Sequence, residues 1–198
     1  MKISPIIPIH RKDLPPEKDG WAWELKLDGF RGLADTINGR MLSKDLNPLK
    51  RLQHLLDALP FDCVFDGQIC ALDSDGRPHF NDLLFGRGDP VYVVFDLLFY
   101  EGEDIRSLPL KERRAILDQV AKRYGLQKSE LFIGCGKSLY QTVCDMDLEG
   151  VVCKRLTDSY GANVRWWKVL NRGYSQKLNR HELLKQQPAW MECHSPSR

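Results

Sequence analysis

Hydrophobic and polar positions along the chain predict alternating strands and helices. Residues 21–42 alternate and contain Asn38-Gly39, a pair typical of tight turns, so this stretch predicts a β-hairpin. Apolar, β-rich runs predict further strands at 63–72, 91–99, 131–136, 150–155 and 166–170. Apolar residues spaced three or four apart predict helices at 49–59, 110–124 and 139–146, with a short helix or loop at 80–84.

The order of these elements predicts an α+β fold in which helices flank two facing antiparallel sheets. Prolines interrupt residues 1–19, which we expect to form an extended N-terminal arm. Residues 20–185 make up the predicted domain, and residues 186–198 a flexible tail.

The composition suits a globular protein, with 198 residues of which 42% are hydrophobic and 28% charged. The formal net charge of +2 does not indicate nucleic-acid binding, so such binding requires a local basic patch. None of the six cysteines forms a CxxC pair, and Cys63, Cys70 and Cys153 lie in apolar runs that predict buried free thiols. No apolar run approaches the roughly 20 residues that span a bilayer, so we expect a cytoplasmic protein without a membrane partner.

The segment 23–32 places Lys26 at the end of a strand-like run, before the turn residues Asp28-Gly29 and a second cation, Arg31. A lysine with a pKa of about 10.4 is almost fully protonated at pH 7, so a nucleophilic lysine needs burial or neighbouring cations. Cations also stabilise the charge that phosphoryl transfer spreads over phosphate oxygens. The segment therefore suits a lysine that attacks a phosphate, although an exposed strand end is an equal alternative.

Further blocks follow this segment, namely FDGQI at 65–69, VYVVFDLL at 91–98, EGVVCK at 149–154 and WWKV at 166–169. With Lys26-x-Asp28-Gly29-x-Arg31, they resemble in order and spacing the adenylation domain of the ATP-dependent DNA ligases. This domain belongs to the covalent nucleotidyltransferase superfamily. Residues 80–117 resemble the DNA ligase branch rather than the RNA ligase or capping-enzyme branches. The resemblance covers about residues 20–185.

This resemblance implies an ATP-grasp-like nucleotidyltransferase fold, with ATP and Mg²⁺ as cofactors. It implies that Lys26 attacks the α-phosphate of ATP, forms a lysyl-AMP and releases pyrophosphate. The other implied catalytic residues are Asp28, Arg31 and Lys168. The implied nucleotide-binding residues are Glu24, Leu25, Gly29, Gln68, Phe95, Val152 and Lys154. Glu149 and Asp66 are the implied metal ligands.

Several of these residues have a structural alternative when the sequence is taken alone. Phe95 fits a core phenylalanine, Glu149 a solvated strand terminus, and Lys168 a strand end whose side chain reaches water. Asp96 is more informative, because a carboxylate inside an apolar strand must find a hydrogen-bond partner.

The chain departs from the family pattern at several positions. Gln68 replaces the usual glutamate, and Leu170 replaces the second lysine of the last motif. The segment 43–46 lacks the usual arginine and glycine, leaving Lys44 as its cation. Losing one contact to transition-state charge costs on the order of 3 kcal/mol. Residues 171–198 are also too few for the OB-fold that ligases of this family carry.

These features support two hypotheses. The first is an ATP-dependent DNA ligase-type enzyme that passes AMP from Lys26 to the 5′-phosphate of a nicked DNA duplex. Nick sealing then requires either that DNA binds without an OB-fold or that a partner protein supplies one. The alternative is a degenerate, non-catalytic module that binds nucleotide or DNA and kept only the fold. Capping-type guanylyl transfer is a weaker third possibility.

Overall fold

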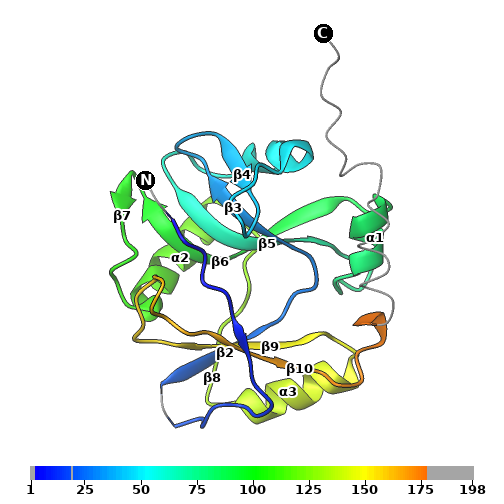
Figure 1. The fold of residues 1–198 in the computed structure, drawn as a ribbon. Helices are drawn as coiled ribbons and strands as arrows, with labels where there is room; N and C mark the ends of the chain where they lie inside the picture. Colours follow the sequence, from blue (N-terminus) through cyan, green and yellow to red (C-terminus); the bar gives the residue numbers. More distant parts are fainter. Residues whose placement is uncertain (1–2, 19, 178–198) are drawn as a thin grey trace.

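The computed structural model describes residues 3–18 and 20–177, which form two five-stranded sheets (Figure 1). Sheet A contains, in spatial order, β1 (Ile9–His10), β10 (Trp167–Leu170), β9 (Gly150–Arg155), β2 (Trp21–Leu25) and β8 (Phe132–Ile133). Sheet B contains, in spatial order, β4 (Arg40–Leu42), β3 (Phe30–Asp35), β5 (Val64–Ala71), β6 (Pro90–Tyr100) and β7 (Glu103–Asp104). The predicted α+β class with two sheets is confirmed.

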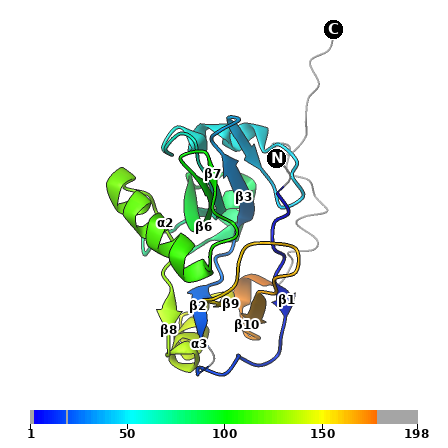
Figure 2. The ribbon, with the colours of Figure 1, turned by 90° about the vertical axis from the view of Figure 1, so that its left-hand side faces the viewer.

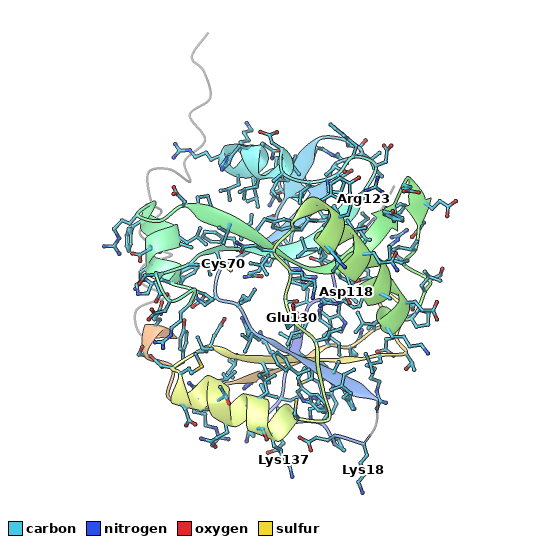
Figure 3. All side chains as sticks on the ribbon, turned by 180° about the vertical axis from the view of Figure 1, so that it is seen from behind. Lys18, Cys70, Asp118, Arg123, Glu130 and Lys137 are labelled. Carbon is cyan, nitrogen blue, oxygen red and sulfur yellow. The ribbon has the colours of Figure 1, made fainter. Side chains whose placement is uncertain are left out.

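Helices cover the outer faces of both sheets. They are α1 (Phe80–Phe85), α2 (Leu110–Tyr124) and α3 (Gly136–Asp145), with short 3-10 helices η1 (Lys50–Leu56) and η2 (Ser175–Lys177). Helix α3 lies below sheet A in Figure 1, and α2 lies on the side of the molecule opposite β1 in Figure 2. Asp118 and Arg123 mark the exposed side of α2 (Figure 3).

The hydrophobic core has three parts, which follow this layering. One lies between sheet B, α2 and η1 and includes Phe65, Leu97 and Leu117. Another lies between sheet A and α3 and includes Trp23 and Val143. The third joins the N-terminal segment to sheet B and to the region just before β10. Burial on both outer faces leaves the facing sides of the sheets to form the site.

Most predicted elements occur close to their expected bounds. Strands β5, β6 and β9 and helix α2 match the apolar runs that predicted them. Helix α2 begins directly after Pro109 and ends at Gly125, which has a φ of +66°. Glycine adopts this left-handed conformation without strain, so the sequence specifies the end of the helix.

The predicted hairpin at 21–42 is only half right. The turn around Asn38-Gly39 joins β3 to β4 as expected. However, β2 does not pair with β3, because β2 belongs to sheet A and β3 to sheet B. The chain crosses between the sheets at residues 26–29, which is also where the proposed nucleophile lies.

Two other expectations need correction. The helix predicted at 49–59 is the shorter 3-10 helix η1, at residues 50–56. Sheet A is mixed rather than purely antiparallel, because β1, in the segment expected to be an extended arm, pairs in parallel with β10. Ile3 and Ile6 are buried. The predicted tail at 186–198 lies outside the described residues.

The predicted free thiols are confirmed, because Cys63, Cys70 and Cys153 are buried and unpaired by disulfides. Burial raises the pKa of Cys70 and of Cys153 to about 12, so both stay protonated near neutral pH. Within the described residues, no helix is long and apolar enough to cross a membrane.

Candidate active site

A cavity of about 260 Å³ opens where the two sheets face each other. We call it the central cavity. It is lined by Ile7, Pro8, Glu24, Leu25, Lys26, Leu27, Gly29, Arg31, Lys44, Gln68, Phe95, Ser129, Val152, Lys154, Trp166 and Lys168. The lining combines aromatic and aliphatic side chains with several cations, a mixture that suits an apolar ring system carrying phosphates.

Lys26 lies directly after β2, where the chain leaves sheet A for sheet B. Its backbone N–H donates to the carbonyl of Gly150 at 2.9 Å, which fixes it beside the start of β9. Its Nζ donates to Oε2 of Glu149 at 2.7 Å, and 22% of the lysine side chain is exposed against 8% of the glutamate. The amine is therefore held by one carboxylate and still reaches the central cavity.

Gly29 explains how the crossover stays close to sheet B. A Cβ atom at this position would lie 2.1 Å from the carbonyl oxygen of Ile69. Any other residue would push the crossover away from β5, and Lys26 with it. The glycine of the first motif therefore has a packing role.

Arg31 forms the wall of the cavity on sheet B. Its guanidinium donates to both carboxylate oxygens of Asp66, with Nε at 2.8 Å from Oδ1, and also to the carbonyl of Ile6 at 2.6 Å. The Tyr160 hydroxyl donates to Asp66 at 2.6 Å. Burial disfavours the charge on Arg31, but the adjacent Asp66 carboxylate outweighs burial and raises the arginine pKa.

The aromatic end of the cavity is formed by Phe95 and Trp166, whose rings meet edge to face at 5.9 Å between centroids. The Lys154 ammonium lies over both rings, at 4.5 Å from the Phe95 centroid and 4.2 Å from that of Trp166. Burial lowers the pKa of Lys154, and the neighbouring Glu24 carboxylate opposes that shift.

Glu24 is 3% exposed and contacts two cations. Its Oε2 lies 2.7 Å from Nζ of Lys154, and its Oε1 accepts from Arg114 at 3.4 Å. Arg114, on α2, also donates to the carbonyls of Phe95 and Ser129. Helix α2 thus anchors a carboxylate acceptor next to the aromatic end.

The partner that the sequence requires for Asp96 is Arg113. The two guanidinium nitrogens Nε and NH2 each lie 2.8 Å from one oxygen of Asp96, and neither side chain is exposed. Arg113 also donates to the carbonyls of Leu108 and Asp158. This ion pair locks β6, the strand of Phe95, to α2.

Most predicted site residues line the central cavity. They are Glu24, Leu25, Lys26, Gly29, Arg31, Gln68, Phe95, Val152, Lys154 and Lys168. Glu149 does not line it, but lies in an adjoining recess that Lys26 also borders. Lys26 therefore forms the boundary between the cavity and this carboxylate.

Asp28 and Asp66 do not line the central cavity. Asp28 is 2% exposed and lies at the recess, where its Oδ2 accepts from the Tyr174 hydroxyl at 2.7 Å. Asp66 is fully buried and contacts Arg31 and Tyr160. Asp66 therefore holds Arg31, while the catalytic role of Asp28 and the metal role of Asp66 stay predictions.

Sequence reasoning assigned no role at the site to several residues. Ile7 and Pro8 line the cavity from the segment expected to be an extended arm. Arg114 and Tyr160 hold cavity residues in place. Two adjacent arginines within an apolar helical pattern were the available signal for Arg114, because a basic pair on the inner face needs buried acceptors.

A Mg²⁺ ion fits this site only with ligands beyond the protein. Among the described residues, no group of three or more His, Cys, Asp or Glu side chains could hold a metal. Mg²⁺ commonly binds through one or two carboxylates together with substrate phosphates and water. Glu149, beside Lys26, can supply one such carboxylate.

Comparison with known proteins defines the family. The protein-family model described as the ATP dependent DNA ligase domain matches residues 9–169 of this chain. The chain therefore belongs to the ATP-dependent DNA ligase adenylation domain family, as the five motifs indicated.

Individual relatives agree. Over 160 residues the chain is 37% identical to the multifunctional non-homologous end joining protein LigD of Pseudomonas aeruginosa, covering 73% of this chain and 19% of that protein. The SPbeta prophage-derived DNA ligase-like protein LigB of Bacillus subtilis is 26% identical, over 90% of this chain and 71% of LigB. A structure of mycobacterial DNA ligase D complexed with ATP and MES aligns with a TM-score of 0.73 and 26% identity, covering 85% of this chain and 60% of that one.

Proposed function

We propose that this protein reacts with ATP to form a lysyl-AMP on Lys26, and passes the AMP to a DNA 5′-phosphate during nick sealing. The observation that carries this proposal is the place of Lys26, which borders the central cavity while its amine contacts Glu149 at 2.7 Å. Among the other lysines of the cavity lining, Lys154 pairs with Glu24 inside the cavity, and Lys44 pairs with Asp45, where both side chains are well exposed.

The first step needs a neutral amine in line with the α-phosphate. The Lys26 nitrogen forms a bond to phosphorus, the bond from phosphorus to the pyrophosphate oxygen breaks, and the ammonium loses a proton. Glu149 is the acceptor closest to that proton. Mg²⁺, when bound, neutralises phosphate charge as pyrophosphate leaves.

The remaining lining suits the rest of ATP. Phe95 and Trp166 offer aromatic surface for the base, and the Glu24 carboxylate beside them offers a hydrogen-bond acceptor. Lys168 and Lys44 line the same cavity and supply cations for phosphate oxygens. Leu170 lies two residues after Lys168 on β10 and so on the same face of the strand, where the usual family lysine would add a further cation.

The test is incubation with ATP labelled at the α-phosphate and Mg²⁺, followed by a denaturing gel. We expect a labelled band in the wild type and none in Lys26→Ala. Lys137→Ala is the matched control, because Lys137 is exposed on α3 (Figure 3) and should keep the label. An unlabelled wild type that still binds ATP would contradict catalysis and favour the non-catalytic binding module.

Transfer to DNA is tested separately, with the labelled protein and a nicked duplex. We expect label to leave the protein and appear on the DNA only when the nick carries a 5′-phosphate. Label that stays on the protein with every DNA would restrict the activity to the first step.

A further inference from the structure

A second cavity lies on the other side of β10 from the central cavity. It has a volume of about 330 Å³ against about 260 Å³ for the central cavity. We call it the outer groove. Its lining includes Trp21, Arg155, Asp158, Asn163, Arg165 and Trp167. Neighbouring residues of a strand point to opposite faces, so Trp166 and Lys168 line the central cavity while Trp167 lines the outer groove.

Two tryptophans and two arginines form a row along this groove. The rings of Trp21 and Trp167 lie 4.7 Å apart between centroids, tilted by 48°. The Arg155 guanidinium lies 4.7 Å from the Trp21 centroid, and that of Arg11 lies 5.1 Å from that of Trp167. Contact with the rings holds these cations over an apolar surface instead of leaving them on flexible stems.

The loop between β9 and β10 adds a third cation. Arg165 is exposed and donates to the carbonyls of Ala162 and Val164, at 2.7 and 3.2 Å. Asp158 is the carboxylate of the groove lining. Arg155 and Arg165 therefore outnumber it in the lining, and Arg11 lies beside the groove over Trp167, although the whole chain carries a formal net charge of only +2.

We propose that the outer groove binds the phosphate backbone of a DNA strand, as a contact separate from the central cavity. Arginine forks match phosphate oxygens, and grooves that combine cations with aromatic side chains are typical of contacts with single nucleic-acid strands. An acidic peptide is the less favoured ligand, because only the thickness of β10 separates this groove from the cavity where we place the reacting nucleotide. The inference rests on the proposed function for the identity of the polymer.

The first experiment measures binding of a fluorescent single strand and of a nicked duplex without ATP, across a range of salt concentrations. The variant is Arg155→Glu with Arg165→Glu, and the matched control is Arg51→Glu with Arg77→Glu, which makes the same charge change at exposed positions outside the groove. We expect about tenfold or greater weakening in the groove variant only. Its plot of log affinity against log salt should be shallower by about 1.4 to 1.8, as for two lost phosphate contacts.

Two single variants guard against misfolding. Arg165→Glu alone removes a side chain whose hydrogen bonds within the described residues go to its own loop, so the fold should persist while DNA binding weakens. Asp158→Asn removes the opposing charge and should strengthen DNA binding. General damage to the fold would not weaken DNA binding in Arg165→Glu and strengthen it in Asp158→Asn.

Several results would overturn the inference. They are unchanged DNA affinity in the groove variants, an equal loss in the Arg51/Arg77 control, and competition by polyglutamate as effective as that by DNA. The proposed function fails by a different result, absence of label on wild-type protein incubated with ATP. If DNA binding is lost in the groove variants while no label forms, the groove stands and the adenylation proposal falls.

Discussion

Two carboxylate–cation pairs in this protein have nearly the same distance but opposite surroundings. Asp96 and Arg113 lie 2.8 Å apart with both side chains fully buried. Glu149 and Lys26 lie 2.7 Å apart, with the lysine 22% exposed at the edge of a cavity. The distance alone would not distinguish a structural pair from a reactive one.

The difference lies in what else each pair contacts. Arg113 also donates to two backbone carbonyls, so its charge is satisfied inside the protein. Lys26 borders both the central cavity and the recess of Glu149, so its amine can exchange one partner for another. The buried pair fixes the wall of the site, and under the proposed function the open pair does the chemistry.

The strongest way to break the buried pair is Arg113→Met. It leaves the Asp96 carboxylate buried without its cation, and should lower the free energy of unfolding by about 3–5 kcal/mol. Urea unfolding measures this. Arg123→Met on the exposed side of α2 (Figure 3) is the control and should change stability by less than about 0.5 kcal/mol. Equal effects from the two variants would contradict a special role for the buried pair.

The open pair of Glu149 and Lys26 should instead affect the reaction rate strongly and stability weakly. Glu149→Gln should slow lysyl-AMP formation by about a hundredfold, close to 3 kcal/mol, because the amine loses its charged partner. Stability should change by no more than about 1 kcal/mol, since the lysine is partly solvated. Rates come from single-turnover labelling, with Glu130→Gln at an exposed ion pair as the control. A stability loss like that of Arg113→Met would show that this pair is structural too.

Asp66→Asn tests whether Asp66 belongs with the buried pair. An amide cannot satisfy both Arg31 nitrogens, so stability should fall by about 1–3 kcal/mol. The Mg²⁺ concentration that gives half-maximal labelling should stay the same. A shift in that concentration without loss of stability would restore Asp66 as a metal ligand.

Gln68→Glu is expected to have the smallest effect. Gln68 lines the cavity and lies opposite Arg31 in the register of β5 and β3. A carboxylate there restores the usual family residue and should raise the labelling rate by less than about tenfold, or 1.4 kcal/mol. A slower reaction would mean that the site has adapted to the amide.

Order along the chain made much of the site predictable. Lys26 and Glu149 meet because β2 and β9 are neighbours in sheet A, and the resemblance to the ligase motifs already implied that both belong to one site. Asp96 could be predicted to have a partner because its strand is apolar on both sides. Helix α2 could be bounded because Pro109 and Gly125 mark its ends.

Long-range contacts outside the motifs were not predictable. Arg114 reaches Glu24 across 90 positions of sequence, and nothing local specifies that approach. The pairing of β1 was hidden because a two-residue strand between prolines has no periodic signal. The burial of Asp66 by Arg31 and Tyr160 was not predictable either, because it depends on how the N-terminal segment and the loop before β10 pack together.

The most direct test of the central claim is to locate the AMP by mass spectrometry of peptides from protein incubated with ATP and Mg²⁺. Lys154 is the most informative alternative site for the AMP. Burial lowers the pKa of its amine, but Glu24 and two aromatic rings enclose that amine. We predict AMP on Lys26 alone. AMP on Lys154 or Lys168 would contradict the account, because the accessible pair would then not be the reactive one.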